Sequence, residues 1–464
     1  MTTQAGELGP ALLAIDDMSL EFRTRSGTVR ALEHVSLSIG RGEIVALVGE
    51  SGSGKTVSAL SLLRLVQNAE VHGQALLGGR DLLALSEREL RGVRGDEVAV
   101  IFQEPMTALN PLYTVGQQIA EVLQLKKGLT AVQAQAGTVE LLASTGIPEP
   151  ARRAGAYPHQ LSGGQRQRAM IAMALASAPK LLLADEPTTA LDVSLRGQIL
   201  DLLADLQRQH GMAVLLITHD LNLVRRFADR VAVMEQGVLV EQGPVAEVFG
   251  APQHAYTRRL IASQPRRDVV ESDPPAGTAP VVKTQDLRVV YPTPLPGIKG
   301  WFKKGEFVAV QGATLQLLPG QTLGVVGESG SGKSVTSLAI MGLLPKASLR
   351  VTSGEILLGR SELTRKSERM MRSIRGGDIA MIFQEPMTSL NPVMTVGAQL
   401  TEAIREHRKN LTESPETIAR QMLDAVQMSD PARRLTQYPH ELSGGMRQRV
   451  MIAMALSCRP KVLI

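Results

Sequence analysis

The sequence contains the same set of motifs twice, and this repeat constrains the fold more than any other feature. Three segments of the first half return in the second half in the same order: Gly49–Thr56 as Gly327–Ser334, Ile101–Pro111 as Ile382–Pro392, and Tyr157–Gly164 as Tyr438–Gly445. The copies lie 278 residues apart for the first pair and 281 for the other two. At roughly 150 residues per domain, 464 residues are enough for two large domains. We therefore expect two homologous domains in tandem.

The stretch between the repeats is rich in proline, glycine and charge. Pro265–Asp268 and Glu271–Pro280 have the composition of an exposed linker. We predict a first domain over residues 1–264, a linker over 265–283 and a second domain over 284–464.

A second irregular stretch, Tyr291–Lys304, follows the linker. Its prolines and glycines disfavour regular structure, so we expect a surface excursion there. Trp301 and Phe302 lie in it beside two lysines. We favour contact of these two aromatic side chains with their own domain. The alternative is contact with a membrane or a partner.

Composition excludes several classes of protein. The net charge of +5 and the 3% aromatic content are too low for a protein that coats or stacks on nucleic acid. The one cysteine, Cys458, excludes a disulfide framework and is typical of a reducing compartment. Acids at Glu7, Asp16 and Asp17 disfavour a signal peptide, and no run approaches the ~20 apolar residues of a spanning helix. We therefore expect neither a secreted nor an integral-membrane protein.

Short apolar runs indicate the fold class. Ile44–Val48, Lys180–Ala184 and Ala213–Ile217 are bounded by Gly, Asp or Thr and do not alternate with polar residues. Such runs are typical of strands buried on both faces of a parallel sheet. Helical patterns such as Leu195–Gln209 lie between them. This alternation predicts an α/β fold.

The segment Gly49–Thr56 follows one of these apolar runs and precedes a helical pattern, as a phosphate-binding P-loop does. Glycines let backbone N–H groups converge on phosphate oxygens, Lys55 would neutralise the phosphates, and the Thr56 hydroxyl would bind Mg²⁺. A chance glycine-rich turn is the alternative, and the second copy argues against it. The predicted phosphate-binding residues are Gly49, Ser51, Gly52, Ser53, Gly54, Lys55 and Thr56, with Gly327, Ser329, Gly330, Ser331, Gly332, Lys333 and Ser334 in the second copy.

Two further strand ends carry polar groups. Asp185 and Glu186 follow an apolar run, where Asp185 would hold Mg²⁺ through water and Glu186 would act as general base on the attacking water. The alternative is an acidic pair that caps the next helix. His219 follows another apolar run and would reach a γ-phosphate. An isolated strand-end histidine is more often structural, but its place 33 residues after Glu186 favours the functional role.

The segment Leu161–Gln165 predicts a second anion-binding helix end. A helix over 165–176 would follow it, with Ser162 as N-cap and two glycines exposing N–H groups. Because the same domain already has a P-loop, the ligand of this helix end would arrive from another domain. The alternative is a capped helix start after a loop. The residues concerned are Ser162, Gly163, Gly164 and Gln165, with Ser443, Gly444 and Gly445 in the second copy.

Together these motifs resemble the nucleotide-binding domain of an ABC transporter. The resemblance rests on the P-loop, Gln103, the LSGGQ signature, the Asp-Glu strand end, Ala190–Asp192 and His219, and it covers nearly the whole chain. It implies a P-loop NTPase fold in each domain, with a RecA-like parallel sheet core and a helical signature subdomain. Two such domains would dock head to tail, with each ATP between one P-loop and the other domain's signature.

The resemblance also implies site residues for ATP and Mg²⁺. Gln103 and Gln384 would sense Mg²⁺ and water, and Glu104–Asn110 and Glu385–Asn391 would lie near the surface that contacts membrane subunits. Catalysis would rest on Glu186, His219, Gln103 and Lys55. The residues near the metal would be Thr56, Gln103, Asp185, Ser334 and Gln384.

Two features resemble the peptide/nickel importer group of this family. One is the sequence FQEPMT-x-LNP, and the other is the tail Ala246–Leu260, where this chain has His254-Ala255-Tyr256 and the group usually has His-Pro-Tyr. Chains with two fused ATPases resemble the ATP-binding proteins of glutathione and of microcin or oligopeptide importers.

The resemblance implies an ATP-hydrolysing subunit that energises an importer for oligopeptides, microcin-like peptides or glutathione. It would be peripheral at the cytoplasmic face of the inner membrane, with two permease subunits and a periplasmic or lipid-anchored solute-binding protein, and without nucleic acid. One alternative is a soluble ABC ATPase that acts on ribosomes or DNA, although a charged linker, a coiled coil and zinc-binding cysteines are absent from the sequence. The other is a catalytically incomplete fragment.

Two positions depart from the family pattern. Met446 stands where the first signature has Gln165, which weakens the anion site of the second copy. The residue equivalent to Asp185 would be number 466, beyond Ile464. We therefore expect the second domain to lack its Mg²⁺ carboxylate, its base and its switch histidine, and the sequence to be an incomplete record of a longer protein.

Overall fold

The structure is a computed structural model that describes residues 11–24, 27–103, 108–188, 193–263, 277–294, 304–328, 330–345, 348–384, 389–409 and 411–464. The chain divides into two compact units, Met1–Asp268 and Val269–Ile464. Within the predicted linker, residues 265–276 lie outside the described part. Strand β11 begins at Val282, so the last two residues of that linker belong to the sheet of the second unit.

A six-stranded sheet forms the centre of the first unit, in the order β10-β9-β3-β8-β7-β6. All pairs in it are parallel except that of β10 with β9. Its strands are β3 (Ile44–Val48), β6 (Val98–Ile101), β7 (Leu181–Asp185), β8 (Ala213–Ile217), β9 (Arg230–Glu235) and β10 (Val238–Pro244). The predicted α/β fold is confirmed, and the three apolar runs form the buried strands β3, β7 and β8.

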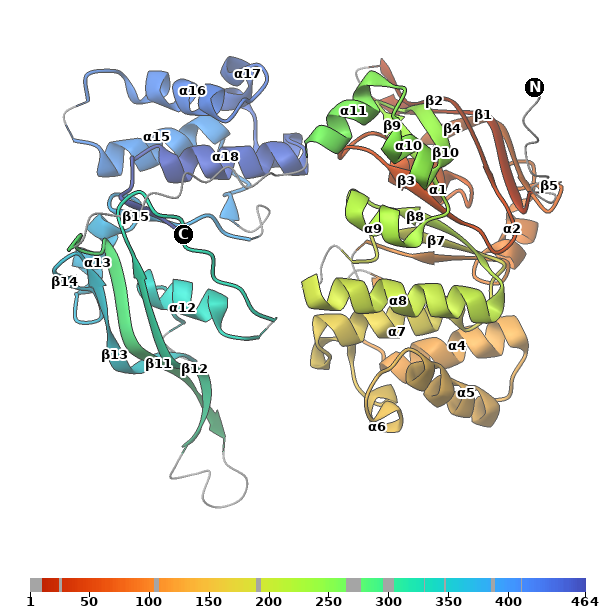
Figure 1. Cartoon of the computed structure of the whole chain (residues 1–464), viewed down its shortest axis with the longest axis horizontal. Helices are drawn as coiled ribbons and strands as arrows, with labels where there is room; N and C mark the ends of the chain where they lie inside the picture. Colours follow the sequence, from red (N-terminus) through yellow and green to blue (C-terminus); the bar gives the residue numbers. More distant parts are fainter. Residues whose placement is uncertain are drawn as a thin grey trace. The chain divides into compact units, whose positions relative to one another are not determined.

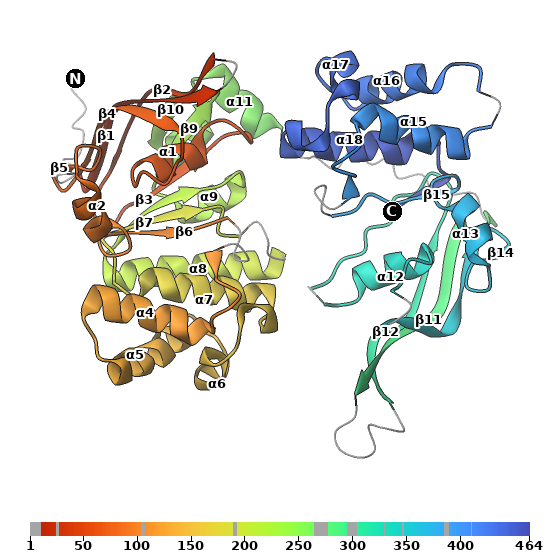
Figure 2. The ribbon, with the colours of Figure 1, turned by 180° about the vertical axis from the view of Figure 1, so that it is seen from behind.

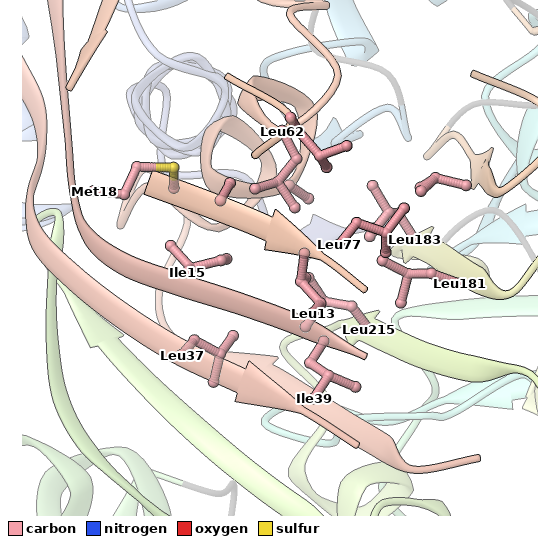
Figure 3. Packing of buried hydrophobic residues seen from close by; sticks show 14 of the residues in the cluster. Leu13, Ile15, Met18, Leu37, Ile39, Leu62, Leu77, Leu181, Leu183 and Leu215 are labelled. Carbon is pink, nitrogen blue, oxygen red and sulfur yellow. The ribbon is translucent and has the colours of Figure 1, made fainter. Parts of the chain in front are cut away.

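A second, antiparallel sheet covers one face of this core. It contains β1 (Leu13–Thr24), β2 (Gly27–Ile39), β4 (Ala69–Leu77) and β5 (Arg80–Asp81) in the order β2-β1-β4-β5. Helices α1 (Lys55–Ser61) and α2 (Glu87–Val93) belong to the same side. Figure 3 shows Leu13 and Ile39 of the antiparallel sheet beside Leu181 and Leu215 of the central sheet. This apolar layer fixes the strand that leads into the P-loop.

Helices cover the opposite face of the central sheet. The apolar sides of α7 (Gly163–Leu175) and α8 (Val193–His210) pack on β6, β7 and β8. Helices α4 (Val115–Lys127), α5 (Ala131–Ser144) and α6 (Pro150–Ala154) form a helical subdomain with α7, beyond the sheet in both Figure 1 and Figure 2. The predicted helix over 195–209 lies within α8, whereas the one predicted over 165–176 begins earlier, at Gly163, because Ser162 caps it there.

The chain after β8 returns to the edge of the central sheet. Helices α9 (Leu221–Phe227), α10 (Val245–Gly250) and α11 (Ala255–Ala262) share one apolar cluster with β3 and β9. The tail that resembles the peptide importer group is therefore packed against the strand that precedes the P-loop.

The second unit repeats the order of the first. Its antiparallel sheet contains β11 (Val282–Pro294), β12 (Lys304–Leu317), β13 (Arg350–Leu358) and β14 (Ser361–Glu362), and β15 (Ile379–Ala380) pairs in parallel with β16 (Val462–Leu463). Its helices are α12 (Lys333–Ile340), α13 (Glu368–Ile374), α15 (Val396–His407), α16 (Pro415–Ala425), α17 (Pro431–Thr436) and α18 (Gly444–Leu456). The sheet order β12-β11-β13-β14 matches β2-β1-β4-β5 of the first unit.

The predicted surface excursion is partly wrong. Tyr291 pairs with Phe307 and Pro294 with Lys304, so both ends of that stretch continue the β11–β12 hairpin. Prolines are accepted after Tyr291 because β13 pairs with β11 only as far as Val290. Beyond that residue, one edge of β11 makes no hydrogen bonds to β13 that a proline would remove. Trp301 and Phe302 lie outside the described residues.

The apolar run before the second P-loop does not form a strand. In the first unit β3 is paired on both sides, by β8 and β9. Within the described part of the second unit no strand pairs with residues 321–328, and Val325 and Val326 are 55% and 92% exposed. The same kind of sequence is thus a buried strand in one unit and an exposed segment in the other, because pairing decides its conformation.

None of the described helices combines the length and the apolar character needed to cross a membrane.

Candidate active site

The predicted catalytic residues of the first unit meet at one edge of the central sheet. The P-loop follows β3, His219 follows β8, Asp185 and Glu186 come at the end of β7, and Gln103 follows β6. These four strands are neighbours and run in parallel, so their carboxyl ends meet at the same edge. Ligands of open α/β sheets bind at this edge.

The P-loop passes close to the neighbouring strand β9. Gly49 has a φ of +154°, and a Cβ atom there would lie 2.2 Å from the carbonyl oxygen of Met234. Lys55 is only 6% exposed, and its Nζ donates to the carbonyls of Gly49 at 2.9 Å and Glu50 at 2.8 Å. The lysine charge is therefore held inside the loop where phosphates are expected.

Burial lowers the pKa of Lys55 from its ordinary value, while the carboxylates of Glu186 and Asp185 act in the opposite direction. An anionic ligand at this place would add to the effect of the carboxylates and favour the charged ammonium.

Thr56 and Asp185 form a pair suited to Mg²⁺. The Thr56 hydroxyl donates to Asp185 Oδ1 at 3.1 Å, and Asp185 is 4% exposed. Burial raises the pKa of Asp185, with Glu186 acting in the same direction and the Thr56 bond against it. Mg²⁺ is bound by one or two protein oxygens together with phosphate and water, so this hard oxygen pair fits the ion. Among the described residues, no group of three or more His, Cys, Asp or Glu side chains is placed to hold a metal ion.

Glu186 lies between two polar side chains. Gln103 Nε2 donates to Glu186 Oε2 at 3.1 Å, and His219 Nδ1 lies 3.2 Å from Glu186 Oε1. The hydrogen bond to Glu186 raises the pKa of His219. Glu186 itself has a φ of +44°, in the left-handed region, and its N–H donates to the carbonyl of Ile217 on β8. Strained backbone of this kind persists where the surroundings fix a functional side chain.

The signature helix α7 begins as predicted at a serine cap. Ser162 Oγ accepts from the Gln165 N–H at 3.3 Å, and Gln165 Oε1 accepts from the Ser162 N–H at 3.3 Å. Ser162 and Gly163 are exposed, whereas Gly164 is buried against Leu195 of α8. The first turn therefore keeps N–H groups accessible to an anion.

The second copy keeps part of this arrangement. Lys333 Nζ donates to the carbonyls of Gly327 at 2.6 Å and Glu328 at 2.7 Å, as Lys55 does in the first P-loop. Ser443 still caps α18 by accepting from the Met446 N–H at 3.4 Å, but the thioether of Met446 cannot return the bond that Gln165 makes. Gln384 is exposed.

Some predicted positions lie outside the described residues. They are Ser329, the Ala190–Asp192 segment, residues 104–107 of the segment after Gln103 and residues 385–388 of the segment after Gln384.

Comparison with known proteins gives the family. The family model described as ABC transporter matches residues 32–189 and 310–464. The chain belongs to the ABC transporter family. It is an ATP-binding cassette ATPase with two tandem cassettes, as the resemblance implied.

Long relatives match nearly the whole chain. It is 47% identical to the peptidoglycan transport ATP-binding protein YejF of Agrobacterium fabrum, over 98% of this chain and 81% of the relative. It is 40% identical to the glutathione import ATP-binding protein GsiA of Escherichia coli O157:H7, over 98% of this chain and 76% of the relative.

Among solved structures, the ATP-binding cassette MJ0796 in a dimeric post-hydrolysis state bound to ADP and Pi is 30% identical, with a TM-score of 0.46. That match covers 50% of this chain and 98% of the solved one.

One residue of this ABC ATPase was missed by reasoning from motifs. The Tyr256 hydroxyl, on α11, accepts a hydrogen bond from the Glu50 N–H of the P-loop at 2.9 Å. The tail sequence His254-Ala255-Tyr256 marked the subgroup, but nothing in it indicated a contact 206 residues away.

Proposed function

We propose that this ABC ATPase drives the import of short peptides or related small solutes, with glutathione and peptidoglycan fragments as the leading substrate classes. The substrate classes come from the names of the relatives that match 98% of the chain. The observation that carries the catalytic part is the arrangement of Thr56, Asp185 and Glu186 around the buried Lys55.

The first unit would bind ATP through its P-loop. The Lys55 ammonium would exchange the carbonyls of Gly49 and Glu50 for phosphate oxygens, which form stronger charge-assisted bonds. Thr56 and Asp185 would hold Mg²⁺, which neutralises developing phosphate charge when bound.

Glu186 would remove the proton from the attacking water. Its side chain is 16% exposed, so water can reach it while the surroundings remain poorly hydrated. Gln103 would orient the carboxylate, and His219, whose pKa is raised by Glu186, would contribute a proton toward the γ-phosphate side.

Hydrolysis in this proposal also needs the signature helices. Helices α7 and α18 begin after the exposed caps Ser162 and Ser443, and their first turns would offer N–H groups to an anion. Each would bind the γ-phosphate of an ATP held by the P-loop of another ABC domain.

The proposed setting is the cytoplasmic face of the inner membrane. Two permease subunits would provide the path for the solute, and a periplasmic or lipid-anchored binding protein would deliver it. ATP binding and hydrolysis would switch the permeases between two conformations.

We expect Lys55→Ala to abolish peptide uptake. It should also strongly weaken nucleotide binding at the first site. Removing a charge that hydrogen-bonds to phosphate costs about 1.5–3 kcal/mol, or roughly 10–150-fold in affinity. The measurement is ATP turnover and uptake of labelled peptide by the transporter reconstituted with its permeases and binding protein.

Lys180→Ala is the matched control, since it removes a lysine whose Nζ forms an exposed ion pair with Glu97. Peptide-stimulated turnover that survives Lys55→Ala would contradict the proposed site. Turnover that responds to nucleic acid or ribosomes, and not to peptide, would favour a soluble ABC ATPase.

We also expect the protein to leave the membrane fraction when the permease subunits are deleted, because the proposal assigns membrane attachment to them. Cell fractionation with and without the permease genes measures this. Lys55→Ala should remain attached in the parent strain, since nucleotide contacts are separate from the permease contact. Equal attachment in both strains would contradict the proposed assembly.

A further inference from the structure

The first P-loop is tied to the tail of its own unit. Both backbone polar groups of Glu50 are bonded: its N–H donates to Tyr256 Oη at 2.9 Å, and its carbonyl accepts from Lys55 Nζ at 2.8 Å. Of these two bonds, the one to Lys55 would be exchanged when the ammonium turns to phosphate. The bond to Tyr256 involves a group that does not face the lysine and would persist.

The surroundings place the Tyr256 hydroxyl accurately. The side chain is 4% exposed and packs in one apolar cluster with Ala46 and Val48 of β3, the strand that leads into the P-loop. Arg259, which pairs with Glu235 at 3.0 Å, lies over the Tyr256 ring at 5.7 Å from its centroid. A buried ring with these contacts keeps its hydroxyl within hydrogen-bonding distance of the loop.

The sequence His-x-Tyr explains how the tail reaches this position. The His254 side chain caps α11 by accepting from the Tyr256 N–H at 3.3 Å. The Glu241 carboxylate of β10 accepts from the N–H groups of Gln253 at 2.8 Å and His254 at 3.0 Å, which attaches the turn to the sheet. Ala255 occupies the first helical position, where proline is also accepted, so the difference from His-Pro-Tyr leaves the arrangement unchanged.

The hydroxyl is suited to accept the bond. Burial raises the pKa of Tyr256, so the side chain stays neutral at physiological pH. A partly buried N–H without an acceptor is costly, so the loop conformation that satisfies Glu50 is favoured over others.

We propose that Tyr256 is a positioning residue of the first nucleotide site, whose hydroxyl holds the Glu50 peptide and keeps the P-loop in the conformation that binds phosphate. The inference rests on the proposed role of Lys55 and the P-loop in binding ATP. Through the bond between Tyr256 and Glu50, the position of α11 would affect the affinity of the P-loop for nucleotide. A bound partner that moves α11 would therefore alter ATP binding.

The test is Tyr256→Phe in the full-length protein, with Lys333→Ala in the background so that nucleotide binding reports on the first site. The variant removes one hydroxyl and keeps the ring, its packing and its contact with Arg259. We expect the Kd for ATP and ADP and the KM for ATP to rise about 3–10-fold, the effect of one lost hydrogen bond. Because Tyr256 does not touch the reacting atoms, kcat at saturating ATP should change less than about twofold.

Amide hydrogen exchange gives a second readout, since the Glu50 N–H should exchange faster in the variant while the amides of α11 do not. Tyr113→Phe is the matched control, because Tyr113 is 53% exposed and its loss of a hydroxyl should leave the KM unchanged.

An unchanged KM with unchanged Glu50 exchange would overturn the proposal. The proposal would also be overturned if Tyr256→Phe lowered the thermal stability and kcat but left the KM unchanged. That result is expected if the hydroxyl has only a structural role. Lys55→Ala separates this inference from the proposed function. If Lys55→Ala loses nucleotide and Tyr256→Phe does not, the positioning role is wrong and the site stands; if Lys55→Ala binds ATP normally, the site itself is wrong.

Discussion

Glu186→Gln should reduce ATP turnover by about 10²–10⁴-fold while ATP still binds. The amide has nearly the size of the carboxylate but cannot accept the proton of the attacking water. In the proposed site the phosphates would be held by the P-loop and by Lys55, whose bonds to Gly49 and Glu50 the substitution leaves in place. Single-turnover hydrolysis and equilibrium ATP binding, measured on the same preparation, check both parts.

Asp220→Asn is the control for loss of a negative charge at this edge of the sheet. Asp220 caps α9 by accepting from the N–H groups of Asn222 and Leu223, and asparagine caps helices equally well. The turnover of Asp220→Asn should fall far less than that of Glu186→Gln, because Asp220 is one of the smaller causes of the raised pKa of His219. Comparable turnover in Glu186→Gln and the parent would remove Glu186 from the role of base.

The meeting of the site's side chains could be predicted because they lie at the ends of strands. Four parallel, adjacent strands bring together Asp185, Glu186 and His219, which short motifs indicated, and Gln103, which the family resemblance indicated. The helix that follows Ser162 could be predicted for a similar reason, although its start was placed two residues late. The expected helix began at Gln165, whereas the cap at Ser162 makes Gly163 the first residue of α7.

Features that depend on distant partners could not be predicted. The bond between Glu50 and Tyr256 joins segments 206 residues apart, and no pattern in either segment requires it. The prolines after Tyr291 indicated irregular structure, but pairing with β12 on one edge is sufficient to keep Tyr291–Pro294 extended. Conversely, Val325 and Val326 have the apolar character of a strand, but they are exposed, and no strand among the described residues pairs with them.

Gly49→Ala should lower both the stability of the first unit and its affinity for ATP. A Cβ at this position would lie 2.2 Å from the Met234 carbonyl oxygen and 2.8 Å from Ser53 Oγ. The first of these is backbone at the end of β9, so it cannot rotate away, and the loop or the strand must move. Overpacking of this kind costs about 1–3 kcal/mol, and a strained backbone adds about 1–3 kcal/mol. The melting temperature of the first unit should therefore fall by roughly 5–15 °C.

Gly52→Ala separates this packing effect from the general cost of an alanine in the loop. Gly52 has a φ of +84°, and nothing lies within 4 Å of the Cβ position, so the substitution has only a backbone cost of about 1–2 kcal/mol. Two quantities are measured: the melting temperature, followed by a probe in the first unit, and the affinity for ATP. Both should be highest in the parent, lower in Gly52→Ala and lowest in Gly49→Ala. Equal losses in the two variants would mean that φ alone sets the requirement for glycine. In that case the close approach of the P-loop to β9 would not be what fixes the loop against the sheet.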